Sequence, residues 1–162
     1  MLNIAVEVNH ITIPAKDKRA SAQLLAYILG LEVGPEMGPF VRVRASSENG
    51  NGLTLDFSDD KDCRLLQCAF LVSVAEFDVA LSRIKREAIK FYSKFDGTEA
   101  CQINRLHGGR GVYFDDSSGH LFELIEQSDG TAADSRIKAV AIKVTRKESR
   151  SCHRLLKRMS RE

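Results

Sequence analysis

The stretch GVYFDDSSGHLFELIEQ (residues 111–127) contains two strand patterns separated by a tight turn. Within the turn segment DDSSG, Gly119 provides the backbone freedom that a tight reversal requires. Alternation in the second strand places Glu123 on one face and its neighbours Phe122 and Leu124 on the other. A carboxylate in such an apolar run must be solvated, hydrogen-bonded, paired with a cation or bound to a metal. The turn therefore predicts a β-hairpin, and Glu123 is its unexplained residue.

The remaining sequence predicts the same order of elements twice. The first unit has apolar patterns and turn signals that predict a strand over 4–14, a helix over 18–29 ended by Gly30, and strands over 40–44 and 53–57. The second unit predicts a strand over 65–74, a helix over 75–88, a short strand within 89–94, and strands over 111–116 and 119–127. Repetition of this kind indicates an internal duplication.

The two units align with their strand polarity preserved. An offset of 57 residues places Gln67 on His10 in the first strands, and an offset of 67 residues places Glu123 on Asp56 in the last strands. The ten additional residues fall in the loop near 96–108. All four polar residues then lie on the face opposite the helices, where we expect them to share one concave surface.

Length and composition indicate a soluble globular chain. The 162 residues can form one well-cored domain or two small modules with a shared core, and the apolar fraction of 43% is ordinary. No apolar run approaches the roughly 20 residues of a membrane span, and the N-terminal segment lacks the pattern of a signal peptide. The four cysteines form no Cys-x-x-Cys pair, so we expect free thiols in a reducing cytoplasm.

Charge is distributed unevenly along the chain. Residues 129–162 carry ten Lys or Arg and four Asp or Glu, although the net charge of the whole chain is only +2. A basic tail can contact nucleic acid, but neither RNP-type aromatic residues nor zinc-finger spacing accompanies it, so nucleic-acid binding is not expected. Residues 137–144 could add a strand, and the tail could cap a sheet edge, assist dimerisation or stay disordered.

The chain resembles the vicinal oxygen chelate superfamily, which includes glyoxalase I, extradiol dioxygenases, fosfomycin-resistance enzymes and bleomycin-binding proteins. The resemblance spans about residues 5–127, in the segments VNHITIPAKDK, YILGL, LTLDF, CAFLVSVAEFD and GGRGVYFDDSSGHLFELI. It implies an α+β fold of two βαβββ modules, residues 1–62 and 63–128, that form a curled mixed sheet around a concave cup. Residues 129–162 would be a C-terminal extension.

The resemblance also implies a divalent metal ion in this cup. The ligand positions of the superfamily correspond to His10, Gln67 and Glu123, and Asp56 takes the place of a further acid. Most metal-dependent members have histidine where this chain has Gln67, and an amide oxygen is a weaker ligand for iron than imidazole. We therefore expect a lyase or isomerase acting on a small oxygen-chelating substrate, rather than a ring-cleaving dioxygenase. Glu123 or Asp56 would be its base.

Other polar residues are candidates for substrate binding. Arg42, Arg44 and Tyr113 alternate with core positions, and His107 lies in the loop before the strand of Tyr113. Salt bridges or solvent contacts are the alternative roles for the first three, and a solvated surface position is the alternative for Asp56. His120, beside the turn, is expected to be a capping or surface residue.

Two other functions remain open at the level of the sequence. A metal-free protein of the bleomycin-resistance type would sequester a small ligand in the cup, and a dimerising scaffold would have no small-molecule activity. We expect a homodimer whose partner is a small-molecule substrate or ligand. Metal content distinguishes the enzyme hypothesis from the other two.

Overall fold

The strands of the protein form two mixed sheets. The computed structural model describes residues 8–45, 52–127 and 140–144. The first sheet has the order β1-β4-β3-β2 and comprises β1 (His10–Ala15), β2 (Val33–Met37), β3 (Phe40–Ala45) and β4 (Leu53–Asp59). The second sheet has the order β6-β7-β8-β5-β9 and comprises β5 (Leu66–Val72), β6 (Phe91–Tyr92), β7 (Gly111–Asp115), β8 (Leu121–Glu126) and β9 (Val140–Val144). The predicted α+β fold of two βαβββ modules is confirmed.

The two helices begin where their capping residues predict. Helix α1 (Lys18–Leu29) follows Asp17, whose carboxylate accepts a hydrogen bond from the backbone N–H of Ala20 at 2.9 Å. Gly30 ends this helix in the left-handed conformation, with φ of 73°. Helix α2 (Val74–Arg86) begins with a capping box, the reciprocal pair of hydrogen bonds between an N-cap serine and a glutamate.

Strand β2 (Val33–Met37) was not predicted from the sequence. Its segment VGPEM lacks the alternation of a strand, because Gly34 and Pro35 interrupt it. The strand lies at the edge of the first sheet, and its pairing with β3 is irregular between Val33 and Glu36. An edge position with a bulge tolerates proline, which cannot donate a backbone hydrogen bond.

The register of the parallel strand pairs supports the internal duplication. Thr12 of β1 lies opposite Asp56 of β4, and Ala69 of β5 lies opposite Glu123 of β8. The predicted offsets of 57 and 67 residues convert the first pair into the second. The two modules therefore preserve the same pairing register along their first and last strands.

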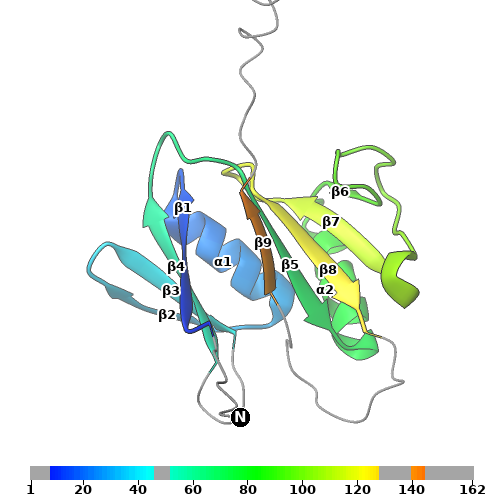
Figure 1. Ribbon diagram of the computed structural model, residues 1–162, viewed down its shortest axis with the longest axis horizontal. Coiled ribbons are helices and arrows are strands. Elements are labelled where there is room, and N and C mark those ends of the chain that lie inside the picture. Colours follow the sequence, from blue (N-terminus) through cyan, green and yellow to red (C-terminus); the bar gives the residue numbers. More distant parts are fainter. Residues whose placement is uncertain (1–7, 46–51, 128–139, 145–162) are drawn as a thin grey trace, which may run out of the picture.

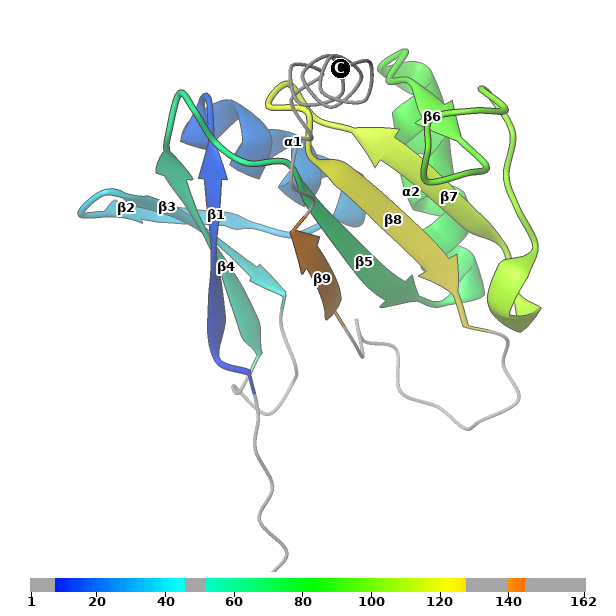
Figure 2. The ribbon, with the colours of Figure 1, turned by 45° about the horizontal axis from the view of Figure 1, so that its top comes forward.

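Each helix covers one face of a sheet and leaves the other face open. Figures 1 and 2 show α1 and α2 behind the two sheets, where the core lies. Its largest fully buried side chains include Phe57, Phe70, Phe77, Phe114 and Phe122. The alternate residues of the strands, including Asp56 and Glu123, face away from this core.

A buried polar cluster joins the two modules. The imidazole of His120 is fully buried, so the expectation of a surface residue was wrong. Its Nδ1 accepts a hydrogen bond from the backbone N–H of Leu66 at 3.2 Å, and its Nε2 donates to the carbonyl oxygen of Pro14 at 2.8 Å. Nearby, the Ser21 hydroxyl donates to Asp116 at 2.6 Å. His120 thus connects β1 of the first module with β5 of the second.

Strand β9 extends the second sheet beyond β5. The predicted strand over 137–144 is observed at residues 140–144, antiparallel to β5. In both Figure 1 and Figure 2, β9 lies between β5 and β1 of the first sheet. This part of the C-terminal extension covers the edge of β5. No helix in the described part of the chain is long and apolar enough to cross a membrane.

Candidate functional site

Glu123 lies in the centre of the open face of the second sheet. It belongs to β8, between Tyr113 of β7 and Ala69 of β5, and only 6% of it is exposed. The Tyr113 hydroxyl donates a hydrogen bond to the Glu123 carboxylate. The Gln67 side chain is the other polar neighbour, with 3.5 Å between its Nε2 and the Glu123 Oε2. Three of the predicted site residues therefore meet here.

The environment of Tyr113 keeps its hydroxyl protonated. Burial raises the pKa of Tyr113, and the hydrogen bond to Glu123 raises it further. Tyr113 and Gln67 are thus uncharged donors to Glu123. Among the described residues, no Lys, Arg or His forms an ion pair with Glu123. A nearly buried carboxylate with uncharged partners is a strong site for a cation or a proton donor.

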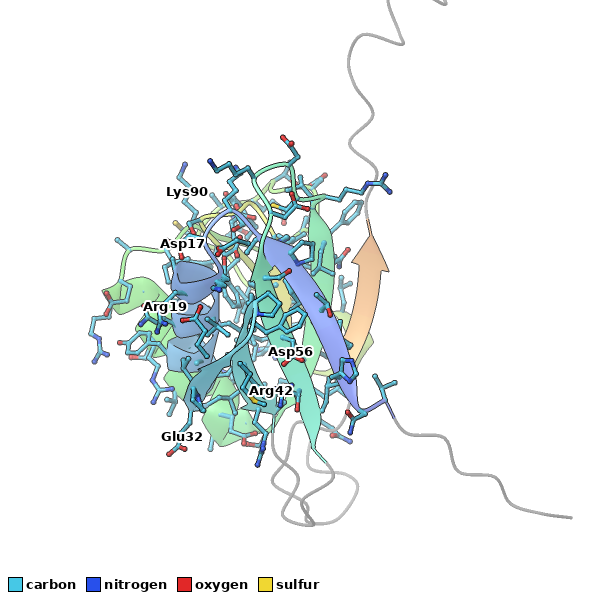
Figure 3. All side chains as sticks on the ribbon, turned by 90° about the vertical axis from the view of Figure 1, so that its left-hand side faces the viewer. Asp17, Arg19, Glu32, Arg42, Asp56 and Lys90 are labelled. Atoms are coloured by element: carbon cyan, nitrogen blue, oxygen red, sulfur yellow. The ribbon has the colours of Figure 1, made fainter. Side chains whose placement is uncertain are left out.

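The equivalent acid of the first module has a different partner. Asp56 is 4% exposed, so the alternative of a solvated surface position does not apply. The Arg42 guanidinium binds its two carboxylate oxygens, with Nε–Oδ1 at 2.8 Å and Nη2–Oδ2 at 3.0 Å. Figure 3 shows these two side chains together on the first sheet. The alternative role of Arg42, a salt bridge, is the one observed.

The duplication makes the comparison of the two acids direct. Arg42 of β3 lies opposite Asp56, and Tyr113 of β7 lies opposite Glu123. The same position therefore carries a cation in the first module and a neutral phenol in the second. The charge of Asp56 is neutralised within the chain, whereas that of Glu123 remains available to a ligand.

His10 and Arg44 lie apart from Glu123 within one chain. Both are exposed on the first sheet, and the His10 Nδ1 lies 3.1 Å from Oδ1 of its neighbour Asn9. Figure 1 shows β5 and β9 between β1, which carries His10, and β8, which carries Glu123. The described residues contain no group of three His, Cys, Asp or Glu side chains able to hold a metal ion. One chain thus brings Gln67 and Glu123 together, without His10.

The remaining predicted residue is His107. Its backbone forms part of a 3-10 turn (Leu106–Gly108), before β7. Its side chain lies outside the described part of the structure, so its proposed contact with a substrate stays a prediction.

A cavity of about 280 Å³ adjoins the Gln67–Glu123 pair. Its lining residues are Leu65, Leu66, Gln67, Phe95, Asp96, Gly97, Asp115, Gly119 and Leu121. The sequence analysis did not identify Phe95, Asp96 or Asp115. Asp115 could have been found, because it shares the strand face of Tyr113 by alternation. Phe95 and Asp96 lie in a loop with no periodic pattern, so only the folded chain brings them to the sheet.

Comparison with known proteins identifies relatives among solved structures. No protein-family model matches the sequence, and no curated protein matches it. The oxidase ChaP-H2 is 37% identical, with a TM-score of 0.70 over 80% of this chain and 100% of that one. The oxidase ChaP-H1 is also 37% identical, with a TM-score of 0.69 over 78% of this chain and 100% of that one.

More distant structures share the fold. The fosfomycin resistance protein FosX from Listeria monocytogenes is 22% identical, with a TM-score of 0.58 over 77% of this chain and 96% of that one. A glyoxalase/dioxygenase from Nostoc punctiforme is 21% identical, with a TM-score of 0.55 over 79% of this chain and 99% of that one. Together with the paired βαβββ modules, these relatives show that the chain belongs to the vicinal oxygen chelate superfamily.

Proposed function

We propose that the protein is a metal-dependent enzyme that acts on a small oxygen-chelating substrate at the open face of the second sheet. The observation that carries this proposal is the state of Glu123. It is nearly buried, and its described partners are the neutral Tyr113 and Gln67, whereas the equivalent Asp56 is neutralised by Arg42. A divalent cation would offset the cost of burying the Glu123 charge.

The donor set within one chain is incomplete for such an ion. Glu123 provides a carboxylate, and Gln67 can present its amide oxygen if its side-chain amide rotates. Sites with oxygen donors suit magnesium or manganese, whereas a nitrogen ligand is typical of iron and zinc sites. The missing nitrogen ligand would be His10, which is exposed on the open face of the first sheet. We therefore propose a homodimer in which His10 of a second copy completes the site.

When bound, a divalent metal ion polarises the oxygen atoms of a chelated substrate. The residues of this chain would have separate tasks around it. Glu123, Gln67 and His10 would hold the ion. The Tyr113 hydroxyl, which stays protonated, would donate a hydrogen bond to a substrate oxygen. Asp56 would not be the base, because both of its carboxylate oxygens bind Arg42.

The type of reaction is proposed from the relatives. The two structures with 37% identity are both named oxidases, which favours oxidation over the lyase or isomerase chemistry expected from Gln67 alone. The replacement of a histidine ligand by Gln67 thus does not by itself argue against redox chemistry. A lyase or isomerase is the second candidate, because it needs only the same metal and a proton donor such as Tyr113.

Metal analysis of protein purified without a histidine tag tests this proposal. We expect a stoichiometric divalent metal ion in the wild-type chain, and its loss in Glu123→Gln and in His10→Ala. The matched controls are Asp56→Asn, which alters the equivalent acid of the first module, and Thr12→Ala on the same exposed face as His10. Both controls should retain the metal. Wild-type protein that neither contains nor binds a divalent ion would instead indicate a metal-free binding protein.

Co-expression of His10→Ala with Glu123→Gln tests whether two copies share the site. A mixed dimer then has one site with both substitutions and one intact site. Random pairing should therefore restore about one quarter of the wild-type metal content. If the mixture binds no metal while the wild-type protein does, the site is not shared between copies.

A further inference from the structure

The cavity beside Gln67 has apolar walls. Leu65, Leu66 and Leu121 lie where β5 and β8 begin, and Phe95 projects from the loop before β7. Phe95 is 67% exposed, which is unusual for a large aromatic side chain unless it contacts a ligand or partner. The cavity thus offers apolar surface directly beside the proposed metal ligands.

The charged residues that line this cavity are all acidic. Asp115 and Asp96 contribute carboxylates, and no Lys, Arg or His is among the residues that line it. The Tyr92 hydroxyl donates to Oδ2 of Asp115 at 3.2 Å, and no described residue donates to its Oδ1. Asp96 accepts two hydrogen bonds from Thr98, both at Oδ1. Each acid therefore keeps one oxygen for a ligand, and an anionic ligand group would be repelled.

The surroundings of Asp115 favour a cationic partner. Burial raises the pKa of Asp115, as does the nearby charge of Asp116, while the Tyr92 hydrogen bond opposes these effects. Lys90 also lowers the pKa of Asp115 through its positive charge, although Lys90 does not line the cavity. A second positive charge placed inside the cavity would stabilise the Asp115 carboxylate directly.

From these observations we infer that the cavity binds the apolar end of a ligand that carries a protonated amine, with Asp115 as the specificity-determining residue. Phe95 would cover the apolar body, and Asp115 would accept a hydrogen bond from the ammonium group. The inference rests on the proposed function, because the cavity opens beside Gln67 of the same site. Cavities of about 150 Å³ hold a benzene ring, so this one has room for a single ring with a short amine chain.

Three matched probes test this inference. 2-Phenylethylamine, 2-phenylethanol and phenylacetate share a ring but differ in charge, and calorimetry or NMR titration at neutral pH measures their affinities. We expect the amine to bind about five- to tenfold more tightly than the alcohol, and phenylacetate to bind most weakly. Asp115→Asn should remove the preference for the amine over the alcohol. Phe95→Ala should weaken all three probes by a similar factor.

Two control variants separate charge from local structure. Tyr92→Phe removes the hydroxyl that contacts Asp115 but keeps the carboxylate, so it should preserve the preference for the amine. Asp59→Asn changes an exposed carboxylate at the end of β4 and should also preserve it. Equal affinity for amine and carboxylate, an unchanged preference in Asp115→Asn, or no binding of any probe would overturn the inference. Metal content of the same samples reports separately on the proposed function.

Discussion

Replacement of His120 should loosen the junction between the two modules. Its imidazole is fully buried and bonds two backbone groups far apart in the sequence, the N–H of Leu66 and the carbonyl of Pro14. Because Leu66 can only donate at its N–H, Nδ1 of His120 is the acceptor and Nε2 carries the proton. His120→Phe would fill a similar volume while leaving both backbone groups without this partner.

The magnitude follows from these two lost hydrogen bonds. A buried backbone group left unsatisfied costs about 1–3 kcal/mol, so His120→Phe should lower the free energy of unfolding by about 3 kcal/mol. For a chain of this size the melting temperature should fall by about 6–12 °C. Urea and thermal denaturation followed by circular dichroism measure both quantities.

The amide variants of His120 provide matched controls. His120→Asn keeps an acceptor near the position of Nδ1, and His120→Gln keeps a donor near the position of Nε2. Each should cost less than His120→Phe, because each can retain one of the two hydrogen bonds. A His120→Phe protein within 1 kcal/mol of wild type, or one more stable than both amide variants, would refute the reasoning.

Three further changes have defined outcomes. Gly109→Ala should destabilise the protein by about 1–3 kcal/mol in urea titration, because the added Cβ would lie 2.1 Å from the carbonyl oxygen of Glu126; a wild-type midpoint would contradict this. Asp56→Asn should lower the melting temperature, since it breaks the two-point contact with Arg42, and added salt should reduce the difference if charge is the cause. Stability should fall as pH rises above about 10, because the raised pKa of Tyr113 means that the unfolded chain loses this proton first; Tyr113→Phe should flatten that decline.

Divergence after duplication explains why the two halves of the protein differ in chemistry. Both modules retain an acid on the last strand and a polar residue opposite it on the preceding strand. In the first module that residue is Arg42, which neutralises Asp56 and ties β3 to β4. In the second it is Tyr113, which leaves the charge of Glu123 for a ligand. One module thus uses its acid for a salt bridge, and the other presents a candidate binding site.

The sequence by itself determined the features that depend on local interactions. Asp17 and Gly30 mark the ends of α1, because capping involves groups within a few residues of the helix ends. Alternation placed Asp56 and Glu123 on the faces opposite the helices, since strand side chains change face at every residue. The duplication, together with these faces, was enough to predict the two modules and the acid of each.

The tertiary structure decided which groups meet, because those contacts join residues distant in the sequence. Strand β2 pairs despite Gly34 and Pro35, since an edge position with a bulge tolerates them. His120 is buried because β1 and β5 pack on either side of it, which no local pattern near the turn indicates. Within one chain the fold brings Gln67 to Glu123 and keeps His10 on another sheet. Strand alternation assigns each residue a face, but only the packing of the sheets decides which faces meet.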